Sequence, residues 1–189
     1  MVRPFIKIPD KIPFFLRIGL WISKHETGKD LLPGKLLTWV PKAALGAGMM
    51  EALTAKGKDT QERRLLNLVR LQASLTCSCA FCIDMNAAGI NVNGITEVEI
   101  AAMQGTIEKE SVVSFDQREL LALEYAIRMS QTPSVFLESF ITQLKSVFSE
   151  KEIVLLASTI ASVNYWARLN QALGIPSAGF SEECYLKQN

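Results

Sequence analysis

Apolar residues along the chain recur mainly at intervals of three and four positions, and strict alternation of apolar and polar residues is nearly absent. Leu120, Leu121, Leu123 and Tyr125 are one example. This spacing places apolar side chains on one face of an α-helix, whereas a half-buried strand would need a period of two. The pattern therefore predicts an all-α, compact multi-helix fold. The expected helices cover residues 13–24, 33–40, 42–56, 59–76, 79–91, 96–104, 116–131 and 134–173, the last in two pieces that break near Ser149.

Three of the expected helix starts carry the same polar signature, a short capping side chain followed three residues later by glutamate. The pairs are Thr96 with Glu99, Asp116 with Glu119, and Ser149 with Glu152. In such a pair the first side chain accepts a hydrogen bond from an early backbone N–H, and the glutamate side chain reaches back to the cap. Stop signals follow at Pro133 and at Gly174 with Pro176, since neither residue type continues a helix well.

The composition is that of an ordinary globular protein. Of the 189 residues, 49% are hydrophobic and 21% are charged, which is enough for a sizeable core. Twenty basic and nineteen acidic residues leave a formal charge of +1, so there is no electrostatic reason to expect nucleic acid as a partner. Because no run of about 18 uncharged apolar residues is present, we expect no membrane span.

The first 24 residues are basic and rich in aromatic side chains. Five basic residues and one acidic residue occur there, together with Phe14, Phe15 and Trp21. A basic amphipathic segment can lie on a membrane surface. We instead expect this segment to pack on the protein's own core or on a neighbouring subunit, because its apolar residues are numerous.

Three of the four cysteines lie within six positions of one another. Cys77, Cys79 and Cys82 form a C-x-C-x-x-C sequence, and Cys184 stands apart. Cysteines this close together cannot join distant segments by disulfides, so we expect thiols that serve chemistry in a reducing, cytoplasmic setting. A tetrahedral zinc site usually takes its four ligands from two separated pairs, and the chain has no second pair. We therefore predict no bound metal and no cofactor.

The C-x-x-C formed by Cys79 and Cys82 can carry redox chemistry. If a helix begins near Cys79, both sulfurs lie in its first turn, where unpaired backbone N–H groups favour a thiolate. A thiolate attacks a peroxide or a disulfide, and the second sulfur can then displace the product as an intramolecular disulfide. The alternative is that these are buried structural thiols, because free cysteine is among the most buried residue types.

Two segments resemble the alkylhydroperoxidase-D-like and carboxymuconolactone decarboxylase family. The segment LLNLVRLQASLTCSCAFCIDMNAAG resembles the family's core motif, and EIVLLASTIASVNYWARLNQALGIP resembles its second signature, an Asn-x-Trp-x-Arg formed here by Asn164, Trp166 and Arg168. Their order, their separation and the final Gly-x-Pro fit as well. The resemblance implies an alkylhydroperoxidase-D-like helical core over residues 59–189, preceded by an N-terminal helical extension over residues 1–58.

The resemblance also implies a function. Family members form homo-oligomers, commonly trimers or hexamers, and the redox members use the dithiol to reduce peroxides or to pass electrons to a peroxiredoxin. Their electrons return through lipoyl or similar thiol donors. The decarboxylase members lack the dithiol, so Cys79 and Cys82 place the chain with the redox branch. By this resemblance Cys82 is the attacking sulfur and Cys79 its resolving partner, in a thiol-dependent antioxidant protein acting on a peroxide or disulfide substrate.

Three positions depart from the family pattern. Asn86 stands where the family carries histidine, Asn67 stands where it carries glutamate, and Phe81 replaces a histidine found in some members. An amide cannot act as a general base near neutral pH, and loss of such a group typically costs a factor of about 10²–10⁴ in rate. The sequence therefore predicts a weak dithiol peroxidase or disulfide reductase. The alternative is a family member without catalysis that binds a ligand or a partner as a helical oligomer.

Few residues near the cysteines could replace the missing groups. Asp84 lies two positions beyond Cys82, so on a helix it should face away from the sulfur, as a solvated or neighbour-paired carboxylate. We expect Arg70 to be a solvent-facing helix charge. We expect Cys77 to fill space at the end of the preceding helix.

Overall fold

The computed structural model describes residues 4–88 and 94–181, and within these ranges the chain is helical and contains no strand. The prediction of an all-α fold is thus confirmed for the described residues. The elements are α1 (Phe14–Thr27), α2 (Leu32–Leu37), α3 (Pro41–Ala52), α4 (Thr60–Thr76), α5 (Ala80–Ala87), α6 (Glu97–Met103), the short 3₁₀ helix η2 (Lys109–Ser111), α7 (Gln117–Ser130), α8 (Glu138–Val147) and α9 (Glu150–Ala172).

Most predicted helices are present, but three of them end three or four residues earlier than expected. The helix predicted to reach residue 40 ends at Leu37, and Val40 is not helical because the following Pro41 disfavours helical geometry before it. The helix predicted over 42–56 ends at Ala52. The helix predicted over 79–91 ends at Ala87, and residues 89–91 lie outside the described part of the chain.

All three predicted capping boxes are present. In α6, α7 and α9 the capping side chain accepts from the backbone N–H three residues on, and the glutamate accepts from the backbone N–H of the cap. The break near Ser149 is also confirmed, since Ser149 caps α9 directly after α8. Short-range hydrogen bonding therefore explains where these helices begin.

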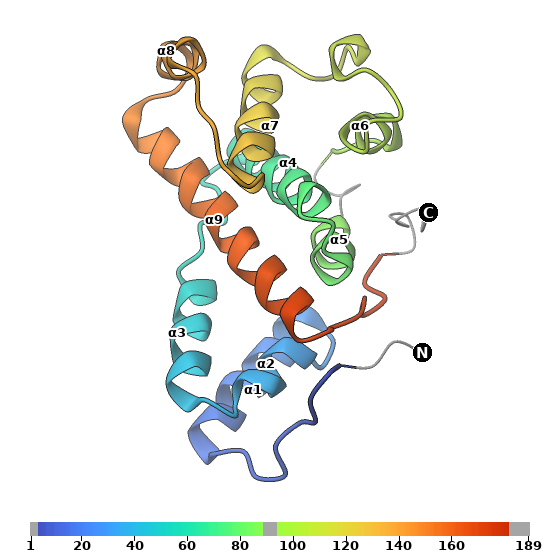
Figure 1. The fold of residues 1–189 in the computed structure, drawn as a ribbon, viewed down its shortest axis with the longest axis vertical. Coiled ribbons are helices and arrows are strands. Elements are labelled where there is room, and N and C mark those ends of the chain that lie inside the picture. The colour runs from blue at the N-terminus through green and yellow to red at the C-terminus, as the bar shows by residue number, and fades with distance from the viewer. Residues whose placement is uncertain (1–3, 89–93, 182–189) are drawn as a thin grey trace.

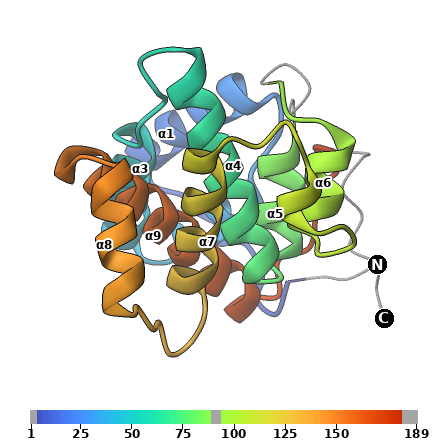
Figure 2. The ribbon, with the colours of Figure 1, turned by 90° about the horizontal axis from the view of Figure 1, so that it is seen from above.

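Helix α4 lies at the centre of the fold. It packs against α7, α9 and α5 (Figure 2). Its buried face consists of apolar side chains with Gln72 and Ser74 among them. The principal core cluster joins residues of α4, α7, α8 and α9 around Leu66, Val69, Leu156 and Ile160. The hydrophobic burial at these contacts supplies the stability that short helices lack on their own.

Helix α9 crosses the molecule, and helices α1, α2 and α3 gather around its C-terminal end (Figure 1). This N-terminal part touches the core through the backbone N–H of Phe5, which donates to the carbonyl of Leu173 at 2.9 Å. Many of its apolar side chains nevertheless remain exposed. They include Phe14, Trp21, Trp39, Met49 and Leu53.

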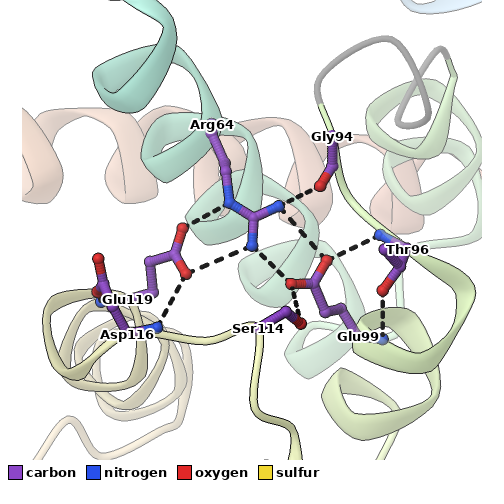
Figure 3. A network of polar contacts seen from close by, with 7 residues as sticks. All are labelled: Arg64, Gly94, Thr96, Glu99, Ser114, Asp116 and Glu119. Carbon is purple, nitrogen blue, oxygen red and sulfur yellow. Dashed lines mark hydrogen bonds and ion pairs between the residues drawn. The ribbon is translucent and has the colours of Figure 1, made fainter.

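An ionic network ties α4 to the starts of α6 and α7 (Figure 3). The Arg64 guanidinium donates to the carboxylates of Glu99 and Glu119, each at 2.6 Å. Both glutamates are also the third residues of capping boxes, so each carboxylate binds its own helix start and Arg64 together. The Ser114 hydroxyl donates to Glu99 at 2.7 Å. The network fixes three helix positions at once.

No helix in the described ranges is both long enough and apolar enough to cross a membrane.

Candidate functional site

The turn between α4 and α5 places the cysteines. Cys77 is the C-terminal cap of α4, Ser78 adopts the left-handed conformation with φ of 52°, and Cys79 is the N-cap of α5. The Cys79 sulfur accepts a hydrogen bond from the backbone N–H of Cys82 at 3.2 Å. The helix therefore begins one residue after Cys79, and both sulfurs of the C-x-x-C lie at its N-terminus, where backbone N–H groups favour negative charge.

Cys79 and Cys82 form a disulfide, with their Cα atoms 5.2 Å apart. The two residues are only 1% and 4% exposed and belong to a core cluster that also contains Cys77, Phe81 and Ala167. Phe81, at the third position that departs from the family pattern, is thus a packing residue. The arrangement can store and release two electrons by opening and closing one bond.

Cys77 stays outside this pair. It is a free, buried thiol that donates to the side-chain oxygen of Asn164 at 3.3 Å. Burial raises the pKa of the Cys77 thiol, and the nearby Arg168 only partly offsets this effect. A thiol of raised pKa is a poor nucleophile near neutral pH, which agrees with the predicted packing role.

Asn170 is a site residue that the sequence did not reveal. It is 1% exposed, its side-chain N–H lies 3.6 Å from the Cys82 sulfur, and its side-chain oxygen has no hydrogen-bond partner. A buried amide with an unused acceptor can bind either a thiolate or a thiol. The available signal was its register, because Asn170 shares the buried face of α9 with Val163 and Ala167, where an apolar residue is the usual choice.

The structure brings Asn67 of α4 and Asn86 of α5 to the same cavity, which has a volume of about 230 Å³. Asn86 donates to the hydroxyl of Ser74 at 2.9 Å, and the carbonyl of Ser74 accepts from the backbone N–H of Cys79. The cavity is therefore connected to the cysteine turn through one residue. Its other lining residues are Glu51, Thr54, Lys56, Arg70, Met85 and Ala88.

The prediction that Arg70 faces solvent is wrong. Arg70 is partly buried, lines the cavity and donates to the side-chain oxygen of Asn67 at 3.3 Å and to the carbonyl of Ala55. Burial lowers the pKa of Arg70, and the charge of Glu51 offsets part of this effect. Helical spacing alone could not show this, because the covering segment comes from the end of α3 and the residues after it.

The Asn-x-Trp-x-Arg sequence joins the cysteine turn to neighbouring elements. Asn164 donates to the hydroxyl of Ser130 at 3.0 Å as well as accepting from Cys77. The Trp166 indole N–H donates to the carboxylate of Glu51 at 2.9 Å and so holds this α3 residue at the cavity. Arg168 donates to the Thr132 hydroxyl. These contacts give the sequence a supporting role around the site.

Asp84 is buried, with an exposed fraction of 4%, so of the two predicted roles the structure excludes the solvated carboxylate and supports the paired one. Its two carboxylate oxygens accept from the backbone N–H groups of Ala178 and Ser181, each at 2.8 Å. Burial would raise the pKa of Asp84, but these hydrogen bonds outweigh burial and lower it. Asp84 therefore anchors the segment that follows α9 onto α5.

Replacement of Asp84 by asparagine is expected to lower the free energy of unfolding by about 1–3 kcal/mol, because the new amide NH₂ faces a backbone N–H and leaves it unpaired. Since the folded-state pKa lies below the unfolded value of about 3.9, the stabilisation is complete above that value and is lost as the pH falls through the folded-state pKa. Urea unfolding between pH 7 and pH 3 measures the free energy of unfolding of both proteins. The difference between the wild type and the Asp84 variant should narrow below about pH 4.

The exposed Asp10 provides the matched control, because Asp10→Asn makes the same chemical change at the surface of the protein. Hydrogen exchange of the Ala178 and Ser181 amides should speed up only in the Asp84 variant. Equal stability of the Asp84 and Asp10 variants at pH 7 would contradict the anchoring role.

No group of three or more His, Cys, Asp or Glu residues within 4–88 and 94–181 is arranged to hold a metal ion.

Comparison with known proteins identifies the fold. No family model matches the chain. The chain is 27% identical to the uncharacterized protein YnjA of Escherichia coli (strain K12) over 176 residues, which cover 89% of this chain and 91% of YnjA. A peroxidase-related protein from Ralstonia eutropha JMP134, described as an alkylhydroperoxidase AhpD core, superposes with a TM-score of 0.77 at 12% identity and 94% coverage of both chains.

A second solved structure is that of the debrominase Bmp8, as a cysteine-to-alanine variant in complex with 2,3,4-tribromopyrrole. It superposes with a TM-score of 0.77 at 15% identity, covering 94% of this chain and 96% of that one. The chain therefore has the alkylhydroperoxidase-D-like fold, as its sequence resemblance predicted. The N-terminal helices are included in this likeness, since the superposition extends well beyond residues 59–180.

Proposed function

We propose that the protein is a thiol-dependent oxidoreductase, a slow dithiol peroxidase or disulfide reductase, in which Cys82 attacks and Cys79 resolves. The observation that carries the proposal is the bonded Cys79–Cys82 pair at the N-terminus of α5. The alkylhydroperoxidase-D-like fold and the peroxidase-related structural neighbours support it.

The chemistry follows from the two sulfurs. In the reduced protein the Cys82 thiolate attacks the distal oxygen of a hydroperoxide ROOH, the O–O bond breaks, and Cys82 becomes a sulfenic acid as ROH leaves. The Cys79 thiolate then attacks the Cys82 sulfur, and the displaced hydroxide leaves as water with a proton. Each subunit thus loses two electrons and two protons, and two thiols of an external donor restore it by exchange.

Local hydrogen bonds favour the roles of the two cysteines. Asn170 is placed to donate to a Cys82 thiolate, and the backbone N–H of Cys82 is placed to donate to a Cys79 thiolate. No titratable group occupies positions 67 and 86, where the family pattern has a glutamate and a histidine. We therefore expect proton transfer to the departing ROH to depend on water, which keeps turnover slow.

The proposed function also suggests an electron donor, a cellular setting and an oligomeric state. A small dithiol, such as a lipoyl group, is the proposed donor, and the proposed setting is the cytoplasm, where the donor keeps the pair reduced between turnovers. We also propose a homo-oligomer, trimeric or hexameric, in which a neighbouring subunit covers the exposed apolar side chains of α1 and α3.

The test uses the reduced protein and one equivalent of hydrogen peroxide. Intact mass should fall by two hydrogen atoms, peptide mapping should locate the new bond between Cys79 and Cys82, and an added dithiol should support repeated but slow consumption of peroxide. Thiols that react only above about pH 8.5, the unperturbed value, together with no consumption of peroxide, would instead favour a non-catalytic protein that binds a ligand or a partner.

A further inference from the structure

The cavity that Asn67 and Asn86 share carries a net positive charge. Three of its lining residues are charged, the cations Lys56 and Arg70 and the carboxylate Glu51, which leaves a net charge of +1. The Glu51 carboxylate accepts a hydrogen bond from the Trp166 indole, and its charge acts on Arg70 without an ion pair, since none joins Arg70 to a carboxylate among the described residues. Because the two cations Lys56 and Arg70 outnumber the single carboxylate Glu51, and charges in a partly buried site are costly when they are unbalanced, this cavity suits one further negative charge.

Arg70 has the donors to bind such a charge. Of the five N–H groups of a guanidinium, one donates to Asn67 and one to Ala55, which leaves three without a hydrogen bond to the described residues. The planar fork of a guanidinium matches a carboxylate with two parallel hydrogen bonds. A single net positive charge matches a monoanion better than the dianion of a phosphate.

The remaining walls fit a small organic molecule. The amides of Asn67 and Asn86 and the hydroxyl of Thr54 offer polar contacts, while Met85 and Ala88 offer apolar ones. The volume of about 230 Å³ leaves room for a small organic molecule.

We propose that this cavity binds a small organic molecule with one carboxylate, which the Arg70 guanidinium holds one helical turn from Cys82. Asn86 is four residues after Cys82 on α5, so both lie on one side of the helix. Met85 lines the cavity and also packs against the cluster that contains the disulfide. That this molecule is the substrate of the dithiol rests on the proposed function. Its binding is inferred from the cavity alone.

The test measures binding of benzoate to the oxidised protein by calorimetry, with benzamide as the neutral ligand of the same shape. Benzoate should bind saturably and benzamide at least about tenfold more weakly, because the charged hydrogen bonds to Arg70 are lost. Arg70→Met should weaken benzoate binding by a similar factor. Arg63→Met is the matched control on the same helix, since Arg63 is exposed and lies outside the cavity, and it should leave binding unchanged.

Three results would overturn the proposal: no benzoate binding to the wild-type protein, equal binding of benzamide, or tighter binding of inorganic phosphate than of benzoate. The comparison of benzoate with benzamide needs no variant, so it decides the question even if Arg70→Met fails to fold. Because binding is measured on the oxidised protein without turnover, it is independent of the peroxide assay. Benzoate binding without peroxide consumption would leave the cavity assignment intact and reject only the proposed chemistry.

Discussion

Replacement of Arg64 by methionine is expected to lower the free energy of unfolding by about 3–5 kcal/mol at pH 7. The change removes the cation of the network in Figure 3 and leaves two carboxylates, Glu99 and Glu119, without their common partner. Glu99 is 0% exposed, so its charge cannot be rehydrated without opening the start of α6. Urea unfolding measures the loss, and the melting temperature should fall by roughly 10 °C for a chain of this size.

The pH dependence separates this explanation from a simple packing defect. Burial would raise the pKa of Glu99, but the hydrogen bonds from Arg64 and Ser114 outweigh burial and lower it. The wild-type stabilisation is therefore present above the unfolded pKa of about 4.3 and is lost as the pH falls through the folded-state value. Without Arg64 the Glu99 pKa rises, so the difference between variant and wild type should shrink below about pH 4.

The neighbouring Arg63 supplies the control for stability as well. Arg63 is exposed, and Arg63→Met should change the free energy of unfolding by no more than about 0.5 kcal/mol. The double variant Arg64→Met, Glu99→Gln should recover part of the loss, since one unpaired charge is gone. A pH-independent loss in Arg64→Met would contradict the electrostatic account of the network.

Replacement of Cys82 by serine is expected to reduce the rate of peroxide consumption to the rate measured in buffer without protein. A serine hydroxyl is not ionised near neutral pH, so the substitution removes the proposed attacking thiolate and leaves Cys79 with only the proposed resolving role. The assay follows loss of hydrogen peroxide with an added dithiol as donor. Circular dichroism and a thermal melt of the reduced proteins establish that both are folded.

The other two cysteines distinguish attack from resolution. Without an added donor, Cys79→Ser should consume about one equivalent of peroxide per subunit and gain the mass of one oxygen atom, because the Cys82 sulfenic acid lacks its resolving partner, whereas the wild type should lose two hydrogen atoms. Cys77→Ser is the matched control and should retain turnover, since serine can still donate to Asn164. Peroxide consumption by Cys82→Ser at the wild-type rate would remove Cys82 from the proposed role.

The sequence predicted the fold class and several helix starts well, because the signals for both act over short distances along the chain. A period of three and four apolar positions and pairs such as Ser149 with Glu152 act within one or two turns, so they can be read without knowing what packs where. The helix ends were less certain, because Leu37 and Ala52 end helices where no strong stop residue stands directly after them.

The same limit applies to the site. The spacing of Cys79 and Cys82 on a helix start was enough to predict two neighbouring sulfurs, and the structure joins them. The sequence predicts a solvent-facing Arg70, because nothing along α4 shows that residues 51–56 cover this side chain. Asn170 and Glu51 were missed for the same reason, since each reaches the site from an element distant in sequence.

By itself the sequence determined the all-α architecture, the capped helix starts and the dithiol, because each depends on residues within about one helical turn of each other. Only the tertiary structure decided the surroundings of that dithiol. Packing of α9 against α4 and α5 brings a buried amide to Cys82, and the contact between Trp166 of α9 and Glu51 of α3 helps to form a charged cavity around Asn67 and Asn86. These contacts join residues far apart in the chain, and hydrophobic burial of whole helix faces, rather than any local preference, sets their geometry.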